Sequence, residues 1–224
     1  MAPPASKSEP RPDRPPLRTD AERNRARILT AANEVFAREG LDAPMAEVAR
    51  CAEVGIATLF RRFPTREDLI TATFADKMTA YADAIDTALA DRDPWHGFRT
   101  YVERVCAMQA EDRGFGHVLT MTFPTAKGFE EERERGYRGL TELIARAKET
   151  GRLRGDFSPE DLVMLLMANA GVIGATGDCA PQTWRRLVGY FLQACDADSA
   201  EPLPDPPTKR QMYRALVRLQ PRNK

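Results

Sequence analysis

The chain lacks any long apolar run. No stretch of its 224 residues approaches the roughly 20 consecutive apolar residues that a membrane-spanning helix needs. The first twenty residues, MAPPASKSEPRPDRPPLRTD, contain no apolar segment of the kind found in secretory signals. We therefore expect a cytoplasmic protein with no membrane partner.

An excess of either charge is also missing. The 33 lysines and arginines balance the 33 aspartates and glutamates, so the formal net charge at pH 7 is zero. Binding to nucleic acid through overall charge is excluded, and any basic surface must be local.

The common enzyme motifs are absent. The sequence holds no glycine-rich phosphate loop, no GxSxG elbow and no HExxH pair. Its only histidines, His96 and His117, have no cysteine or carboxylate at ligand spacing, so we expect no metal and no cofactor. The four cysteines form no CxxC pair, as expected of reduced thiols. A buried carboxylate pair is the one catalytic arrangement left open, and no pattern points to it, so we expect a protein that is not an enzyme.

Strand-like alternation is absent too, and apolar residues recur every three or four positions, the period of amphipathic helices. The sequence predicts an all-α fold. Pro44 is expected in the first turn of a short second helix, and Thr65 with Asp68 forms a capping box that opens a long fourth helix. Gly114 and Gly116 are expected to break the chain between two later helices. The charged run EEERER at 130–135 is expected to be the solvated start of another.

The first seventy residues contain three short helices, the second and third joined by a tight turn, which is the pattern of a helix-turn-helix. In the third, VGIATLFRRF at 54–63, Leu59 and Phe63 are expected to face inward with Val54 at the entry. Its other side carries small and apolar residues beside two arginines, which suits close approach to base edges and phosphates. The alternative is a helical hairpin within a larger bundle.

The segment ILTAANEVFAREGLDAPMAEVARCAEVGIATLFRRFPTREDLI, residues 28–70, resembles the N-terminal signature of the TetR family of bacterial transcriptional regulators. RGDFSPEDLVMLLMANAGVI and WRRLVGYFLQAC resemble the C-terminal domain of its SbtR-like subgroup. The resemblance implies a homodimer whose two heads bind a palindromic operator in double-stranded DNA. It also implies a helical body with a pocket for an unknown small-molecule effector that moves the heads out of register. Most members are repressors.

Three positions depart from the family pattern. Glu53 stands where glycine is common in the turn, and a positive φ there costs about 1 kcal/mol. Phe60 replaces a tyrosine whose hydroxyl reaches a phosphate, and Ala43-Pro44 replaces a hydroxyl residue at the start of the second helix.

The expected contacts with DNA follow from this alignment. Arg61 is expected at a base edge, and Arg62 and Arg66 at phosphates, while Arg23 and Arg27 are equally compatible with a solvated helix face. The full set is Arg23, Arg27, Met45, Gly55, Ile56, Ala57, Thr58, Phe60, Arg61, Arg62 and Arg66.

Two sets of residues are expected in the body. The pocket candidates are Phe98, Met108, Phe115, Met121, Phe123, Met164, Met167 and Asn169, for which plain core is the alternative. The amide of Asn169 needs a ligand, another helix or water as its partner. The dimer-interface candidates are Met167, Val172, Trp184, Leu187, Val188 and Phe191, which otherwise complete the subunit core.

The sequence thus divides into four parts. They are a disordered basic, proline-rich tail (1–17), a helix-turn-helix DNA-binding domain (18–70), a helical regulatory and dimerisation domain (71–200), and a linker with a further short helix (201–224). The predicted function is a ligand-released repressor. The alternative is a helical adaptor or small-molecule-binding protein that keeps this fold without binding DNA.

Overall fold

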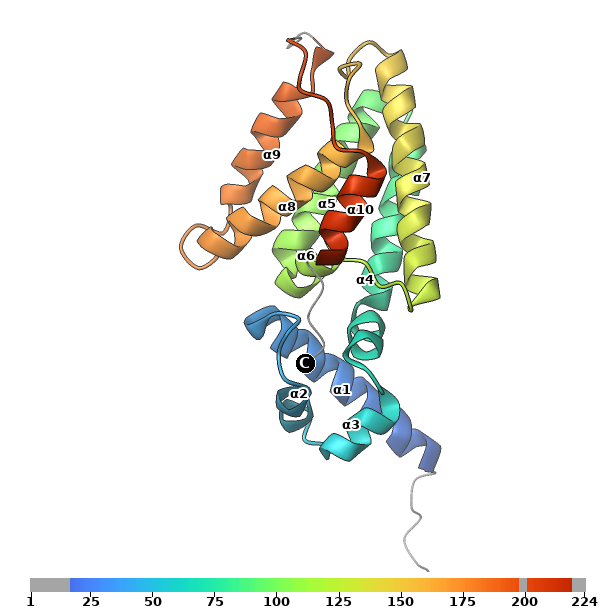
Figure 1. The fold of residues 1–224 in the computed structure, drawn as a ribbon, viewed down its shortest axis with the longest axis vertical. Coiled ribbons are helices and arrows are strands. Elements are labelled where there is room, and N and C mark those ends of the chain that lie inside the picture. The colour runs from blue at the N-terminus through green and yellow to red at the C-terminus, as the bar shows by residue number, and fades with distance from the viewer. Residues whose placement is uncertain (1–16, 198–200, 219–224) are drawn as a thin grey trace, which may run out of the picture.

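The protein is described by a computed structural model over residues 17–197 and 201–218, and this part of the chain contains ten helices and no strand (Figure 1). The helices are α1 (Leu17–Glu39), α2 (Met45–Cys51), α3 (Ile56–Arg62), α4 (Arg66–Leu89), α5 (Pro94–Glu111), α6 (Arg113–Leu119), α7 (Lys127–Glu149), α8 (Pro159–Thr176), α9 (Thr183–Ala194) and α10 (Lys209–Arg218). The predicted all-α fold is confirmed. The predicted tail lies outside the described residues, apart from Leu17, which begins α1.

Helices α1 to α3 form a small head at one end of the molecule, below the larger body (Figure 1). Ile28, Val48 and Leu59, one from each helix, are fully buried and pack in its centre. Gly40 ends α1 with a φ of 82°, a left-handed conformation that favours glycine. Pro44 is the N-cap of α2 and not part of its first turn, because Met45 is the first helical residue.

Helix α4 connects the head to the body. The predicted capping box opens it, since Thr65 accepts from the backbone of Asp68 and Asp68 accepts from the backbone of Thr65. Farther along, the ring of Phe74 lies 6.3 Å from that of Phe36 in α1 and 6.1 Å from that of Phe115 in α6. Head and body therefore share one hydrophobic core, and the predicted boundary between residues 70 and 71 falls inside α4.

The break between α5 and α6 lies at Asp112, so the break predicted at Gly114 and Gly116 is wrong. Asp112 is the N-cap of α6, and its Oδ1 accepts from the backbone N–H of Phe115 at 3.0 Å. The two glycines lie buried within α6 because the helix passes close to its neighbours. A Cβ on Gly114 would lie 2.9 Å from the ring of Phe74.

Asp112 also joins three helices. Its side chain is almost fully buried, and its Oδ2 accepts from Asn33 Nδ2 in α1 at 2.9 Å and from Lys77 Nζ in α4. A buried carboxylate needs such partners because burial without them is costly. The head, the connecting helix and the body are therefore tied at one side chain, which we call the Asp112 junction.

Helix α7 packs along α4, and α8 and α9 close the body (Figure 1). The charged run at 130–135 lies near the start of α7, where Glu131 and Glu134 are exposed as predicted, but its two arginines have partners in the protein. Arg133 donates to the carbonyl oxygens of Val118 and Leu119 at 3.0 and 3.2 Å, and Arg135 pairs with Asp83 on α4 at 2.6 Å. No helix among the described residues is long and apolar enough to cross a bilayer.

Candidate nucleic-acid interface

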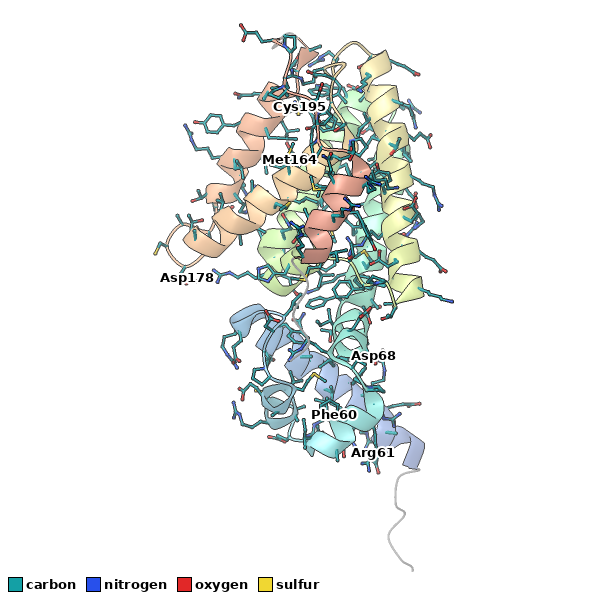
Figure 2. All side chains as sticks on the ribbon, viewed as in Figure 1. Phe60, Arg61, Asp68, Met164, Asp178 and Cys195 are labelled. Atoms are coloured by element: carbon teal, nitrogen blue, oxygen red, sulfur yellow. The ribbon has the colours of Figure 1, made fainter. Side chains whose placement is uncertain are left out.

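The outer side of α3 is an exposed surface at the end of the molecule far from Cys195, where Phe60 and Arg61 lie (Figure 2). Ile56 and Phe60 are 42% and 44% exposed, unusually high for large apolar side chains one helical turn apart. Arg61 and Arg62 are also exposed, and Arg61 Nη2 donates to Thr58 Oγ1 at 2.9 Å. This surface combines apolar contact area with two positive charges.

The inner side of α3 fixes its position. Leu59 is completely buried and Phe63 is 5% exposed, while Val54 packs against the core from the entry of the helix. Gly55, the last residue of the turn, is the N-cap of α3. It and Ile56, the first residue of the helix, both lie at the surface. The helix can therefore present its outer residues without moving against α1 and α2.

The turn before α3 holds Glu53 in a left-handed conformation, with a φ of 51°. Arg27 of α1 supports the turn: its Nη2 donates to the carbonyl oxygens of Ala52 at 2.6 Å and Glu53 at 3.1 Å. It also pairs with the Glu53 carboxylate at 3.3 Å, but that carboxylate is 86% exposed and contributes little stability.

We expect Glu53→Gly to be more stable than Glu53→Ala by about 1 kcal/mol, because only glycine adopts a positive φ without strain. Both substitutions remove the ion pair with Arg27, so their difference isolates the backbone conformation. Urea denaturation of the two variants measures the free energies of unfolding. Equal stabilities would contradict the strained turn.

The arginines predicted to contact DNA differ in their exposure and in the partners they already have within the protein. Arg66 Nη1 donates to the carbonyl oxygens of Leu41 and Ala43 in the loop before α2, and its side chain is partly buried. Arg23 is exposed and lies 3.5 Å from Asp20 on the same helix. Arg27 and Arg66 thus hold loops of the head, which leaves Arg62 as the more accessible candidate.

Met45 is 9% exposed and belongs to the core of the head, so little of its side chain is available to a partner. The Asp112 junction was missed by the sequence reasoning. Its partners Asn33 and Lys77 come from positions far away along the chain, and only the order Asp-Arg-Gly hinted that a helix begins there.

The pocket candidates are not gathered in one cavity. Phe98, Met108, Phe115 and Phe123 are buried core residues, Met121 and Met167 are partly buried, and Met164 is 43% exposed on α8 (Figure 2). None of the eight lines any of the four clefts described for the protein. The burial of Phe98, Met108, Phe115 and Phe123 agrees with plain core, whereas Met164 is exposed, and the pocket stays a prediction.

Asn169 finds its partner in another helix. Its Nδ2 donates to Gln109 Oε1 at 2.8 Å and to the Cys106 carbonyl oxygen at 3.3 Å, both on α5. Gln109 in turn donates to the Leu166 carbonyl oxygen on α8 at 3.1 Å. This buried amide pair fixes the register of α5 against α8.

The residues predicted at the dimer interface also differ in how deeply they are buried. Trp184 and Val188 belong to the subunit core, whereas Met167, Val172, Leu187 and Phe191 are partly buried. Beyond them, α8 has an exposed stripe that the sequence reasoning did not isolate. It consists of Met164, Ala168, Gly171 and Ala175, and Tyr190 on α9 is exposed as well.

Two family models match the chain. Residues 28–73 match the model of bacterial regulatory proteins of the tetR family, and residues 93–193 match that of the C-terminal domain of SbtR-like transcriptional regulators. These matches confirm both resemblances read from the sequence. The first covers the second half of α1, α2, α3 and the start of α4, and the second covers the body from α5 almost to the end of α9.

Individual proteins of known sequence or structure are also similar to this chain. The HTH-type transcriptional regulator LuxR of Vibrio harveyi is 41% identical over 58 residues, a segment that spans 25% of this chain and 28% of LuxR. The structure of FadR from Bacillus subtilis, in complex with stearoyl-CoA, has a TM-score of 0.59 at 14% identity and covers 76% of this chain and 96% of FadR. RolR in complex with resorcinol has a TM-score of 0.51 at 20% identity and covers 85% of this chain and 100% of RolR. The last two show a common fold.

Proposed function

Because this chain belongs to the TetR family of transcriptional regulators, we propose that it is a dimeric repressor whose α3 helices read a palindromic operator and are released by a small molecule. One observation carries the proposal. The family's DNA-reading helix presents Ile56, Phe60, Arg61 and Arg62 at the surface while Leu59 and Phe63 hold it in place.

Each outer residue of α3 has a role in the proposal. Arg61 reads a base edge in the major groove, where a bidentate guanidinium–guanine pair discriminates between bases. Phe60 has no hydroxyl to donate to a phosphate, so it and Ile56 supply apolar contact, for which the methyl group of thymine is the suitable partner. Arg62 neutralises a phosphate and adds to the salt dependence of binding.

The exposed stripe on α8 supports the proposed dimer. Met164, Ala168, Gly171 and Ala175 present small or apolar side chains, which allow two helices to pack closely. A symmetric interface of two such bodies places the heads on the same face of DNA, and a two-fold axis requires a palindromic site. Tyr190 at 55% exposure extends the same surface on α9.

Release by a ligand follows from linkage. A molecule that binds more tightly to the body when the heads are out of register weakens operator binding by the same free energy. The complexes of FadR with stearoyl-CoA and RolR with resorcinol support a small-molecule site in the body. The Asp112 junction gives a direct route from the body to the head. We place this activity in the cytoplasm, where bacterial DNA lies.

The test is operator binding across a salt series, beginning with DNA upstream of the protein's own gene and a shuffled control. We expect Arg61→Ala to lose about 1–3 kcal/mol of specific binding if the side chain reads a base. Arg99→Ala, an exposed arginine on α5, is the matched control and should bind as the wild type does.

Three outcomes of this binding experiment bear on the proposed function. Specific, steeply salt-dependent binding that Arg61→Ala weakens supports the proposal. Wild-type affinity in Arg61→Ala removes Arg61 from the interface but keeps the function. Equal and weak binding to every fragment in a genome-wide selection would show a protein that keeps the fold without reading DNA.

A further inference from the structure

A cleft of about 270 Å³ lies in the body between α4, α7 and α8 and is covered by α10. In Figure 1, α10 lies between α7 and α8. The cleft is lined by Tyr81, Leu119, Thr122, Glu130, Arg133, Glu134, Tyr137, Glu160, Val163, Leu166, Lys209, Met212, Tyr213 and Leu216. Its volume is close to that of a small ligand pocket.

The polar groups of this cleft include several tyrosines and three glutamates, together with Arg133 and Lys209. Glu160 is 8% exposed, and its Oε1 accepts from the hydroxyl of Tyr137 at 3.2 Å. Within the described part of the chain, no lysine or arginine nitrogen lies within 4.0 Å of Glu160, so its charge is not neutralised by an ion pair.

The neighbouring carboxylates affect the acidity of the Tyr137 hydroxyl. Burial and the neighbouring carboxylates of Glu160 and Glu134 raise the pKa of its hydroxyl to about 12. The hydroxyl of Tyr137 contacts one carboxylate, that of Glu160, and a second, that of Glu134, is close enough to affect it. Aromatic faces and carboxylates together are the groups that bind an organic cation.

The chain already places a cation there. Lys209 Nζ, at the start of α10, lies 3.9 Å from the centroid of the Tyr137 ring and 3.7 Å from Glu134 Oε2. Little else holds α10. Met212 is its one buried side chain, Tyr213 is 49% exposed, and the preceding segment 201–207 contains four prolines. Lys209 is thus a replaceable occupant.

The basic group of the cleft is not free for an anion. Arg133 donates to the carbonyl oxygens of Val118 and Leu119 and forms an ion pair with the Glu130 carboxylate, 3.3 Å away. An acidic ligand would meet Glu134 and Glu160 without an available counter-charge. The site therefore favours positive ligands over acids such as acyl-CoA esters.

We propose that this cleft is the effector site and that its ligand is an organic cation with an apolar body, such as an aryl or alkyl amine or quaternary ammonium compound. The ligand's positive charge takes the place of Lys209 beside the Tyr137 ring and Glu134, with Glu160 as a further carboxylate of the site. Its apolar part lies against Val163, Leu166 and Met212 as α10 moves away. This inference rests on the proposed function, in which the body holds the effector.

The test is calorimetric titration of the full-length protein, without DNA, with benzyltrimethylammonium, benzyl alcohol and benzoate. These probes share one ring and differ in charge. We expect binding of the cation alone. Glu160→Gln should weaken it about tenfold, which corresponds to about 1.4 kcal/mol.

Lys209→Gln should change affinity in the opposite direction, because it removes the competing cation; we expect binding about tenfold tighter than in the wild type. Arg210→Gln removes the same charge from an exposed neighbour on α10 and should bind as the wild type does. A merely structural role of Glu160 and Lys209 would not produce opposite shifts with unchanged melting temperatures.

Several results would overturn the proposal. They are equal binding of the neutral or acidic probe, wild-type cation affinity in both variants, or no cation binding even in Lys209→Gln. Since the titration contains no DNA, these results leave operator binding untouched. Cation binding by a protein that reads no operator would instead separate this site from the proposed function.

Discussion

Replacing Gly171 by arginine is expected to convert the proposed dimer into folded monomers and to lower operator affinity at least about a hundredfold. Gly171 is exposed on α8, and a Cβ added there meets no atom within 4 Å, so the single subunit has room for the new side chain. Across a close helix pair, however, two unpaired guanidiniums would be buried, at a cost of about 3–5 kcal/mol.

Light scattering coupled to gel filtration gives the mass, and circular dichroism shows whether the monomer keeps its helices and melting temperature. Gly128→Arg is the matched control, because Gly128 is an exposed helical glycine on α7 that is also free of neighbours. A dimer that persists in Gly171→Arg would place the interface elsewhere on the body.

The second large effect is expected in stability. Phe74→Ala should lower the free energy of unfolding by about 3–5 kcal/mol, because it removes a large side chain from a site that cannot close up. Phe74 is fully buried and its ring contacts those of Phe36 and Phe115, so the lost packing lies between head and body.

Guanidinium denaturation followed by circular dichroism measures the change. Phe60→Ala makes the same chemical change on the surface of α3 and should alter stability by no more than about 0.5 kcal/mol while weakening operator binding. Similar stabilities of the two variants would mean that Phe74 is not a shared core residue of head and body.

Local signals in the sequence were sufficient for most helix ends. The capping box of Thr65 and Asp68 and the left-handed Gly40 depend on residues within four positions, so the sequence contains the whole interaction. The positive φ of Glu53 was indicated by the family resemblance, in which glycine is common at this position of the turn.

Interactions between distant segments were not predictable in this way. Arg66 donates to carbonyl groups more than twenty positions away, so its sequence neighbours gave no sign that it faces the loop before α2. The pocket could not be located from the sequence for a related reason. Aromatic and methionine residues at helical spacing, such as Phe98 and Phe115, have the same pattern whether they line a cavity or fill a core.

The cleft proposed for the effector includes charged residues that no apolar stripe marks. Glu134 and Tyr137 belong to a highly charged helix, and Lys209 follows a proline-rich segment that read as a linker. Only the return of α10 across α7 and α8 brings them together, and no feature of a single helix encodes that return.

The Asp112 junction has a consequence for acidity. Burial favours the neutral acid, but hydrogen bonds from Lys77, the Phe115 N–H and Asn33 outweigh it and lower the pKa of Asp112 below its ordinary value of 3.8. A carboxylate with a depressed pKa contributes its stability above the unfolded value, and that stability is lost only as pH falls through the lower folded value. The tie between head and body is thus fully charged across the neutral range, and changes in proton concentration there cannot loosen it.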